Sequence, residues 1–173
     1  MVSRSTRSLS RKITIAVCLG IFSAILVWSG KDTERRRTEE LKGSGWEEVA
    51  RWGYITPQLQ VNSAVNLPPM VLADFMMGRG AMPARAAAVS ALAVAVFWAW
   101  FLCSFDPAAA TPATVLLTAR KVLAVLVIAA PLYVLSRGGL LHFPLLAAAA
   151  VCWIVIGFFL LYRSRLTARH HLP

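Results

Sequence analysis

The chain has 173 residues, of which 58% are hydrophobic and only 15% are charged, a composition too apolar for an ordinary soluble domain. Its formal net charge of +10 does not indicate nucleic-acid binding, because the sequence contains no visible base-reading module on a soluble fold. Basic residues beside apolar stretches indicate membrane topology and attraction to anionic headgroups instead.

The N-terminal segment, residues 1–12, is basic and contains no acid, and residues 13–29 form a mostly apolar stretch. That stretch is short for a transmembrane helix but lies within the usual range of lengths. Trp28 interrupts the small-x-small pattern of a signal-peptidase site, and Cys18 comes too early to be a lipoprotein cysteine. We therefore predict an uncleaved first transmembrane helix at 13–29 after a cytoplasmic N-terminus. The Arg- and Ser-rich start leaves a mitochondrial transit segment as an alternative.

Residues 30–85 are predicted to form a loop on the outer, non-cytoplasmic side of the membrane. Asp32 is a candidate cap for a first short helix that ends near Gly43, and a capping-box pattern predicts a second short helix over 44–52. The first helix places Arg35 before Glu39 and Arg36 before Glu40, at the spacing that favours ion pairs on an exposed helix.

Within this loop, residues 61–77 are apolar enough to enter a membrane but too interrupted to span it. Asn66 is a candidate N-cap, and Pro68 and Pro69 follow in the first helical turn, where a missing N–H costs least. A helix of about ten residues cannot cross a bilayer. We expect it to be amphipathic and interfacial, re-entrant, or packed on the other helices, with Asp74 facing protein, water or a partner.

The second transmembrane helix is predicted at 86–105, which is twenty residues without a charge. Small residues recur on it at every fourth position and form a candidate helix-packing stripe, since small side chains allow helix backbones to approach closely. A group of aromatic residues at its far end is typical of a membrane-interface belt. The stripe consists of Ala87, Ala91, Ala95 and Ala99, and the belt of Trp98, Trp100, Phe101 and Phe105.

Two further transmembrane helices are predicted at 114–135 and 140–162, followed by a basic cytoplasmic tail at 163–173. Arg120 and Lys121 lie near the start of the third helix, where their side chains can extend to the headgroups. Pro131 predicts a kink. Four crossings place both termini on one side. The positive-inside rule favours the cytoplasm for that side, because the long, basic first loop weighs less than the short segments.

No pattern in the sequence carries catalytic chemistry, and we predict no catalytic residue, no cofactor and no metal site. The spacing of the three cysteines favours neither a disulfide framework nor a zinc site. His142, at the outer end of the fourth span, has no second histidine within a span to share a haem. A candidate outer-face polar cluster contains Asn66, Asp74, Arg137 and His142, which the topology places on one side of the membrane.

The sequence thus predicts an all-α integral membrane protein with four transmembrane helices and an outer-face amphipathic or re-entrant helix. Its predicted function is that of a non-catalytic accessory or scaffolding subunit that packs with other membrane-protein subunits. The alternative is a small membrane enzyme or carrier with a site on the outer face. The Ala-rich, Lys-poor spans favour a bacterial inner membrane, with the mitochondrial inner membrane as the alternative.

Overall fold

A computed structural model describes residues 4–45, 55–77, 82–104, 113–136 and 143–169. All six helices in these ranges are α-helices, and no strand occurs in them. Four of the helices are long and apolar enough to cross a membrane, and one shorter apolar helix accompanies them. The chain is therefore a multi-pass helical membrane protein, and its apolar helices contact the lipid bilayer.

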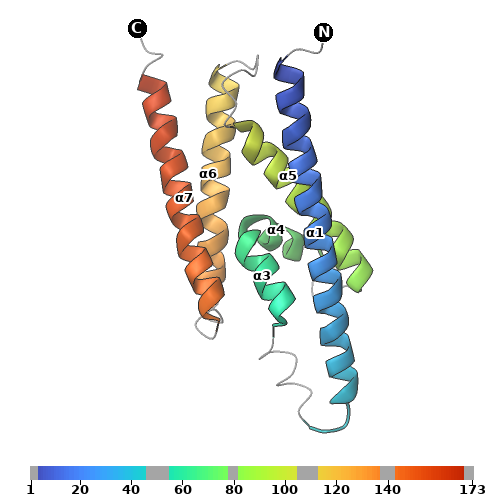
Figure 1. The fold of residues 1–173 in the computed structure, drawn as a ribbon. Helices are drawn as coiled ribbons and strands as arrows, with labels where there is room; N and C mark the ends of the chain where they lie inside the picture. Colours follow the sequence, from blue (N-terminus) through green and yellow to red (C-terminus); the bar gives the residue numbers. More distant parts are fainter. Residues whose placement is uncertain (1–3, 46–54, 78–81, 105–112, 137–142, 170–173) are drawn as a thin grey trace.

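The four long helices run alternately in opposite directions (Figure 1). They are α1 (Arg4–Glu40), α5 (Pro83–Ser104), α6 (Ala113–Ser136) and α7 (Pro144–Arg169). The first residues of α1 and the last of α7 consequently lie at the same end of the bundle. The helices form two closely packed antiparallel pairs, α1 with α5 and α6 with α7.

Small residues allow the helices of each pair to approach closely. The buried face of α1 carries Ala16, Gly20, Ser23 and Val27, at alternating spacings of four and three residues. A Cβ atom placed on Gly20 would lie 2.7 Å from the backbone oxygen of Ala91 on α5. In the other pair, a Cβ atom on Gly157 of α7 would lie 2.4 Å from Ile128 Cγ1 on α6. A side chain on Gly20 would collide with the backbone of α5, whereas a side chain on Gly157 would require the Ile128 side chain to move.

Two short helices join the two pairs. They are α3 (Pro57–Val65) and α4 (Leu67–Met77), and together they form a helical hairpin that we call the α3–α4 hairpin. The hairpin packs on all four long helices, whereas the only direct backbone packing between the two pairs in the described residues is a small contact of α5 with α6. It lies between the pairs, toward the end of the bundle opposite to the start of α1 (Figure 1). The hairpin is therefore the element that holds the pairs together.

The sequence of the hairpin explains its shape. Thr56 caps α3 by accepting a 3.4 Å hydrogen bond from the backbone N–H of Leu59, and Pro57 starts the helix. The chain turns at Asn66, which lies between the two helices. Pro68 and Pro69 then lie in the first turn of α4, where the absent N–H groups would have had no intrahelical partner. The predicted apolar segment 61–77 is thus the end of α3 followed by α4.

One prediction about local structure was wrong. A separate short helix is predicted to begin near Asp32, but α1 continues without a break to Glu40. Gly30 does not end the helix; instead it provides room for α3, since a Cβ there would lie 2.5 Å from Leu59 Cγ and 2.7 Å from Thr56 Oγ1. At about 1.5 Å per residue, the 37 residues of α1 extend well beyond a hydrocarbon core of roughly 30 Å.

Each of the other three predicted spans corresponds to one helix, but the helices begin and end at residues other than those predicted. Pro144 begins α7, as proline does at many helix starts, and the helix continues through Arg169 into the segment predicted as a tail. No glycine or proline separates that basic segment from the apolar span, so nothing in the sequence stops the helix. Pro131 lies inside α6, where the kink was predicted. The predicted second short helix at 44–52 lies almost entirely outside the described residues.

Candidate functional site

A chain of hydrogen bonds between two buried amides and a half-buried indole lies at the turn of the α3–α4 hairpin. Trp98 Nε1 on α5 donates to Asn66 Oδ1 at 2.8 Å, and Asn66 Nδ2 donates to Asn62 Oδ1 at 3.0 Å. Asn62 Nδ2 in turn lies 3.1 Å from the sulfur of Met70, which accepts a weak hydrogen bond. Asn62 is fully buried and Asn66 is 2% exposed. These amides therefore bind one another instead of water.

A second indole binds the same turn from the other helix pair. Trp153 Nε1 on α7 donates to the backbone oxygen of Ala64 at 3.0 Å. Ala64 lies in the last turn of α3, where carbonyl groups have no partner within the helix. The indole of Trp153 thus satisfies a carbonyl group that would otherwise be buried without a hydrogen bond. We call the set Asn62, Ala64, Asn66, Trp98 and Trp153 the hairpin corner.

Aromatic rings pack around the hairpin corner and join α5 to α7. The Trp98 and Trp153 ring centroids are 6.2 Å apart, and Phe97 lies 5.9 Å from Trp153 in an edge-to-face arrangement. Phe101 contacts both Phe97 and Trp98. Such pairs contribute about 0.5–1.5 kcal/mol each beyond their area burial. The hairpin corner is consequently enclosed by protein on the side of both helix pairs.

The groups of the hairpin corner are neutral at all ordinary pH values. Amides and indoles neither exchange protons near neutral pH nor act as nucleophiles. What they provide is directional hydrogen bonding, and here it fixes one turn of the hairpin to α5 and to α7. The hairpin corner therefore serves to position helices.

Asp74 lies elsewhere, at the far end of α4 near the charged part of α1. Its side chain is exposed, yet the protein around it still removes part of the solvent and raises the pKa of the carboxyl above its ordinary value of 3.8. The positive charge of Lys31 lowers this pKa and the negative charge of Glu34 raises it, both less than desolvation does. Lys31 and Glu34 form an ion pair of 2.8 Å with each other.

The raised pKa of Asp74 predicts a pH dependence of stability. Because the folded chain favours the protonated carboxyl, the cost of burying the charge is absent below about pH 3.8 and grows as the pH rises through the pKa of the folded state. Asp74→Asn should remove this cost, so the variant should exceed the wild type in thermal midpoint at neutral pH and lose that advantage toward pH 4. A constant difference between pH 4 and 8 would contradict the assignment. The effect should be small, since the side chain is exposed.

The structure does not bring the predicted outer-face polar cluster together in the part of the chain it describes. Asn66 is buried in the hairpin corner, whereas Asp74 lies two turns farther along α4, beside Lys31 and Glu34. At about 1.5 Å per residue, eight residues separate them by roughly 12 Å along the helix. Arg137 and His142 lie outside the described residues, and their place in the cluster stays a prediction.

The predicted alanine stripe lies on α5, the helix that packs on α1. Ala91 and Ala95 are the residues nearest to the Cβ position of Gly20, and Ala87 is buried, whereas Ala99 is partly exposed. The small residues opposite the stripe, Ala16, Gly20 and Ser23, were not singled out from the sequence. In the sequence, these residues form a repeat of small side chains within the first apolar stretch.

The hairpin corner itself was missed by the sequence analysis. Trp98 was assigned to a membrane-interface belt, but its indole N–H donates to Asn66 inside the bundle. Trp153 received no role. The available signal was the coincidence of two asparagines in an apolar segment with tryptophans inside two predicted spans, because buried amide and indole groups require partners. Phe105, another predicted belt residue, lies outside the described residues.

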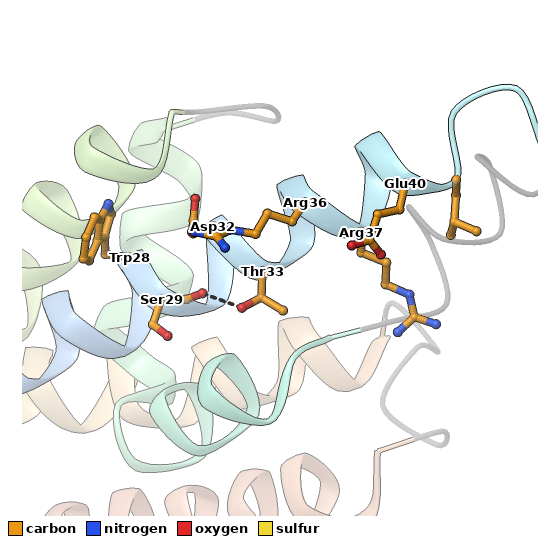
Figure 2. A pocket seen from close by; sticks show the side chains of 8 residues that line it. Trp28, Ser29, Asp32, Thr33, Arg36, Arg37 and Glu40 are labelled. Atoms are coloured by element: carbon orange, nitrogen blue, oxygen red, sulfur yellow. Dashed lines mark hydrogen bonds and ion pairs between the residues drawn. The ribbon is translucent and has the colours of Figure 1, made fainter.

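The charged end of α1 borders an open hollow lined by residues from Trp28 to Leu41 (Figure 2). Charged side chains there form ion pairs within the helix. Arg35 pairs with Glu39 at 3.2 Å as predicted, whereas Arg36 pairs with Asp32 at 2.9 Å rather than with Glu40. An acid four residues before a base is the better arrangement, because it agrees with the helix dipole. This part of α1 is exposed along most of its surface.

Within the described ranges, no group of three or more His, Cys, Asp or Glu side chains is placed to hold a metal ion. The three cysteines are free thiols. Comparison with protein-family models, with curated proteins and with solved structures finds no match to this chain.

Proposed function

We propose that this chain is a non-catalytic accessory or scaffolding subunit of a larger membrane-protein complex. The observation that carries the proposal is the hairpin corner, in which two buried amides bind each other and the Trp98 indole, and the Trp153 indole binds a helix carbonyl. Groups paired in this way stabilise an arrangement of helices and do not present a reactive atom to a substrate. On this proposal, the interior maintains the fold and a partner binds at the surface.

The surface that supports partner binding is the charged segment Lys31–Glu40, which we call the α1 extension. It projects past the ends of the neighbouring helices (Figure 1). It carries residues of both charges, six of which form the three ion pairs described above. A rigid, charged helix in this position has little role in packing the chain's own core, and complementary charges favour recognition of a specific partner.

The distribution of charge supports an orientation for this proposal. Both termini would lie in the cytoplasm of a bacterium, and the α1 extension would face the opposite side of the inner membrane. The basic N-terminal and C-terminal segments favour this orientation, because the positive-inside rule gives most weight to Lys and Arg in short segments beside the spans. In a mitochondrial inner membrane, the equivalent side for the termini would be the matrix.

The primary experiment is extraction from native membranes in a mild detergent, followed by native-gel separation and mass spectrometry of the co-migrating band. An accessory subunit should migrate with a large complex of fixed composition. Migration of the chain alone, near 18.9 kDa or a small multiple plus detergent, would contradict the proposal. Turnover of a substrate by the purified chain would contradict it as well.

A charge reversal in the α1 extension tests the binding surface. Arg35→Glu should reduce the fraction of chain in the large complex about fivefold, because one favourable interface charge becomes unfavourable, an effect of roughly 1 kcal/mol. The control is the double variant R35E/E39R, which restores the intrahelical pair and the net charge. If only helix stability mattered, the double variant would recover the complex; if the partner recognises charge positions, it will not. Unchanged migration of R35E would contradict the assignment of this surface.

A further inference from the structure

The turn of the α3–α4 hairpin lies at the level where α7 passes the middle of its apolar span. That span is Pro144–Ser164, and Trp153 is the tenth of its 21 residues. Trp153 Nε1 binds the backbone oxygen of Ala64 at 3.0 Å, so the turn lies within one side-chain length of the midpoint. At about 1.5 Å per residue, the midpoint is roughly 15 Å from either end of the span, which is half of a hydrocarbon core of roughly 30 Å.

The contact with α5 is consistent with this depth. α5 begins on the side of the α1 extension and runs away from it (Figure 1), and Trp98 is the sixteenth of its 22 residues. Side chains of a helix point back toward its N-terminus. The indole of Trp98 is therefore directed back toward the middle of α5, where it binds Asn66 Oδ1 at 2.8 Å. Two helices from different pairs thus place the same turn near mid-depth.

Both ends of the hairpin lie at the boundary between the apolar and the charged part of α1. Residues 13–30 carry no charge, and Lys31 is the first charged residue after them. A Cβ atom on Gly30 would lie 2.7 Å from Thr56 Oγ1, so α3 begins at this boundary. α4 returns toward it, because Asp74 near the end of α4 interacts electrostatically with Lys31. The 11 residues of α4 extend about 16 Å, the distance from mid-depth to the boundary.

The polar groups of the turn are satisfied by protein, as hydrocarbon requires. Asn62 and Asn66 are buried and bind each other, and the indole of Trp153 binds the carbonyl group at the end of α3. Hydrocarbon contains no water that could bind such groups, so each needs a partner within the protein. At the level of the headgroups, water could bind them and no indole partner would be required.

The outward side of the hairpin is apolar. Five apolar side chains on it are between 44% and 67% exposed, and they lie along both helices, from the second turn of α3 to the last turn of α4: Val61, Val65, Leu72, Phe75 and Met76. A surface of this composition at this depth fits the acyl chains of one leaflet, because hydrocarbon is the surrounding medium between mid-depth and the boundary.

We infer that the α3–α4 hairpin is re-entrant and that its outward side binds acyl chains. It enters the hydrocarbon from the side of the α1 extension, turns at the middle of the bilayer and returns to the same side. The depth of the hairpin corner and the exposed apolar side chains carry this inference, which does not depend on the accessory role proposed above. Of the arrangements predicted for the apolar segment 61–77, it excludes the interfacial one.

The experiment measures depth with nitroxide spin labels on the purified full-length chain in phosphatidylcholine liposomes. Oxygen concentrates in the middle of a bilayer and a nickel chelate stays in water, so the ratio of their collision rates with a label rises with depth. The labelled variants are Val65→Cys near the turn, Met76→Cys near the end of α4 and Arg35→Cys on the α1 extension, with the native cysteines replaced by alanine. Native Cys152, which is exposed and precedes Trp153, is labelled alone as the mid-depth control.

We expect the collision ratio at Val65 to equal that at Cys152 within about twofold and to exceed that at Arg35 about tenfold, with Met76 between them. A ratio at Val65 no higher than at Met76 would overturn the inference, because the hairpin would then lie flat at the surface. Spin–spin broadening between labels on Val65 would overturn it as well, since a second copy of the chain would then cover this side.

Circular dichroism verifies that the chain without its native cysteines folds. Should it not fold, the wild type decides: it is reconstituted with a phosphatidylcholine that carries a diazirine at the end of one acyl chain, irradiated and mapped by mass spectrometry. Adducts on Val61 or Val65 are expected together with adducts on Val155, which is exposed near the middle of α7. Adducts on Val155 with none on α3 would refute the inference.

Discussion

Gly20→Leu is expected to separate α1 from α5 and to lower the free energy of unfolding by about 3 kcal/mol, the upper part of the range for overpacked interiors. The Cβ atom alone would lie 2.7 Å from the backbone oxygen of Ala91 and 3.0 Å from Ala95 Cβ. A side chain can move aside, but a backbone carbonyl within α5 cannot move without breaking helical geometry. The effect should therefore exceed that of Gly157→Leu, whose nearest neighbour is the flexible side chain of Ile128.

The measurement for Gly20→Leu is unfolding by SDS in mixed micelles, followed by tryptophan fluorescence and circular dichroism. Cys18→Leu is the matched control, because Cys18 lies on the same helix two residues away and its side chain is exposed. The control should unfold at the same SDS fraction as the wild type. If Gly20→Leu did so too, α1 and α5 would not approach as closely as the structure describes.

Asn66→Leu is expected to cost about 2 kcal/mol, because it leaves a buried amide oxygen and a half-buried indole N–H without partners. Trp98 Nε1 loses its acceptor and Asn62 Oδ1 loses its donor, and an unsatisfied buried group costs about 1–3 kcal/mol in proteins. In membrane proteins, hydrogen bonds between side chains of different helices stabilise the fold by amounts toward the lower end of this range. The expected loss is still a large fraction of the stability of a small domain.

The double variant N66L/W98F distinguishes a lost hydrogen bond from a simple change of shape. Phenylalanine has no indole N–H, so the double variant leaves only Asn62 Oδ1 without its partner. Because Trp98→Phe also reduces the ring packing against Phe101 and Trp153, the test is the coupling: the loss in the double variant should be smaller than the sum of the two single losses by about 1 kcal/mol. Strictly additive losses would show that Trp98 and Asn66 do not interact.

The two faces of the contact between α1 and α5 differ in how well they could be predicted from the sequence. The alanine stripe is a local pattern of one helix, so its residues were found, but the glycine it packs against belongs to α1 and lies far away in sequence. The continuity of α1 through Gly30 was missed for a related reason. A glycine in a polar stretch is typical of a helix end, and only the packing of Thr56 and Leu59 against it shows that it makes room for α3.

The sequence by itself determined the helical class, the four crossings and the location of the interrupted apolar segment, because hydrophobic length and charge placement act locally along the chain. Only the tertiary structure decided the hairpin corner. Trp98 and Asn66 are 32 residues apart, and Trp153 and Ala64 are 89 apart. No spacing pattern encodes such pairs. They form because a helical hairpin packs between two helix pairs and its buried polar groups must find hydrogen-bond partners there.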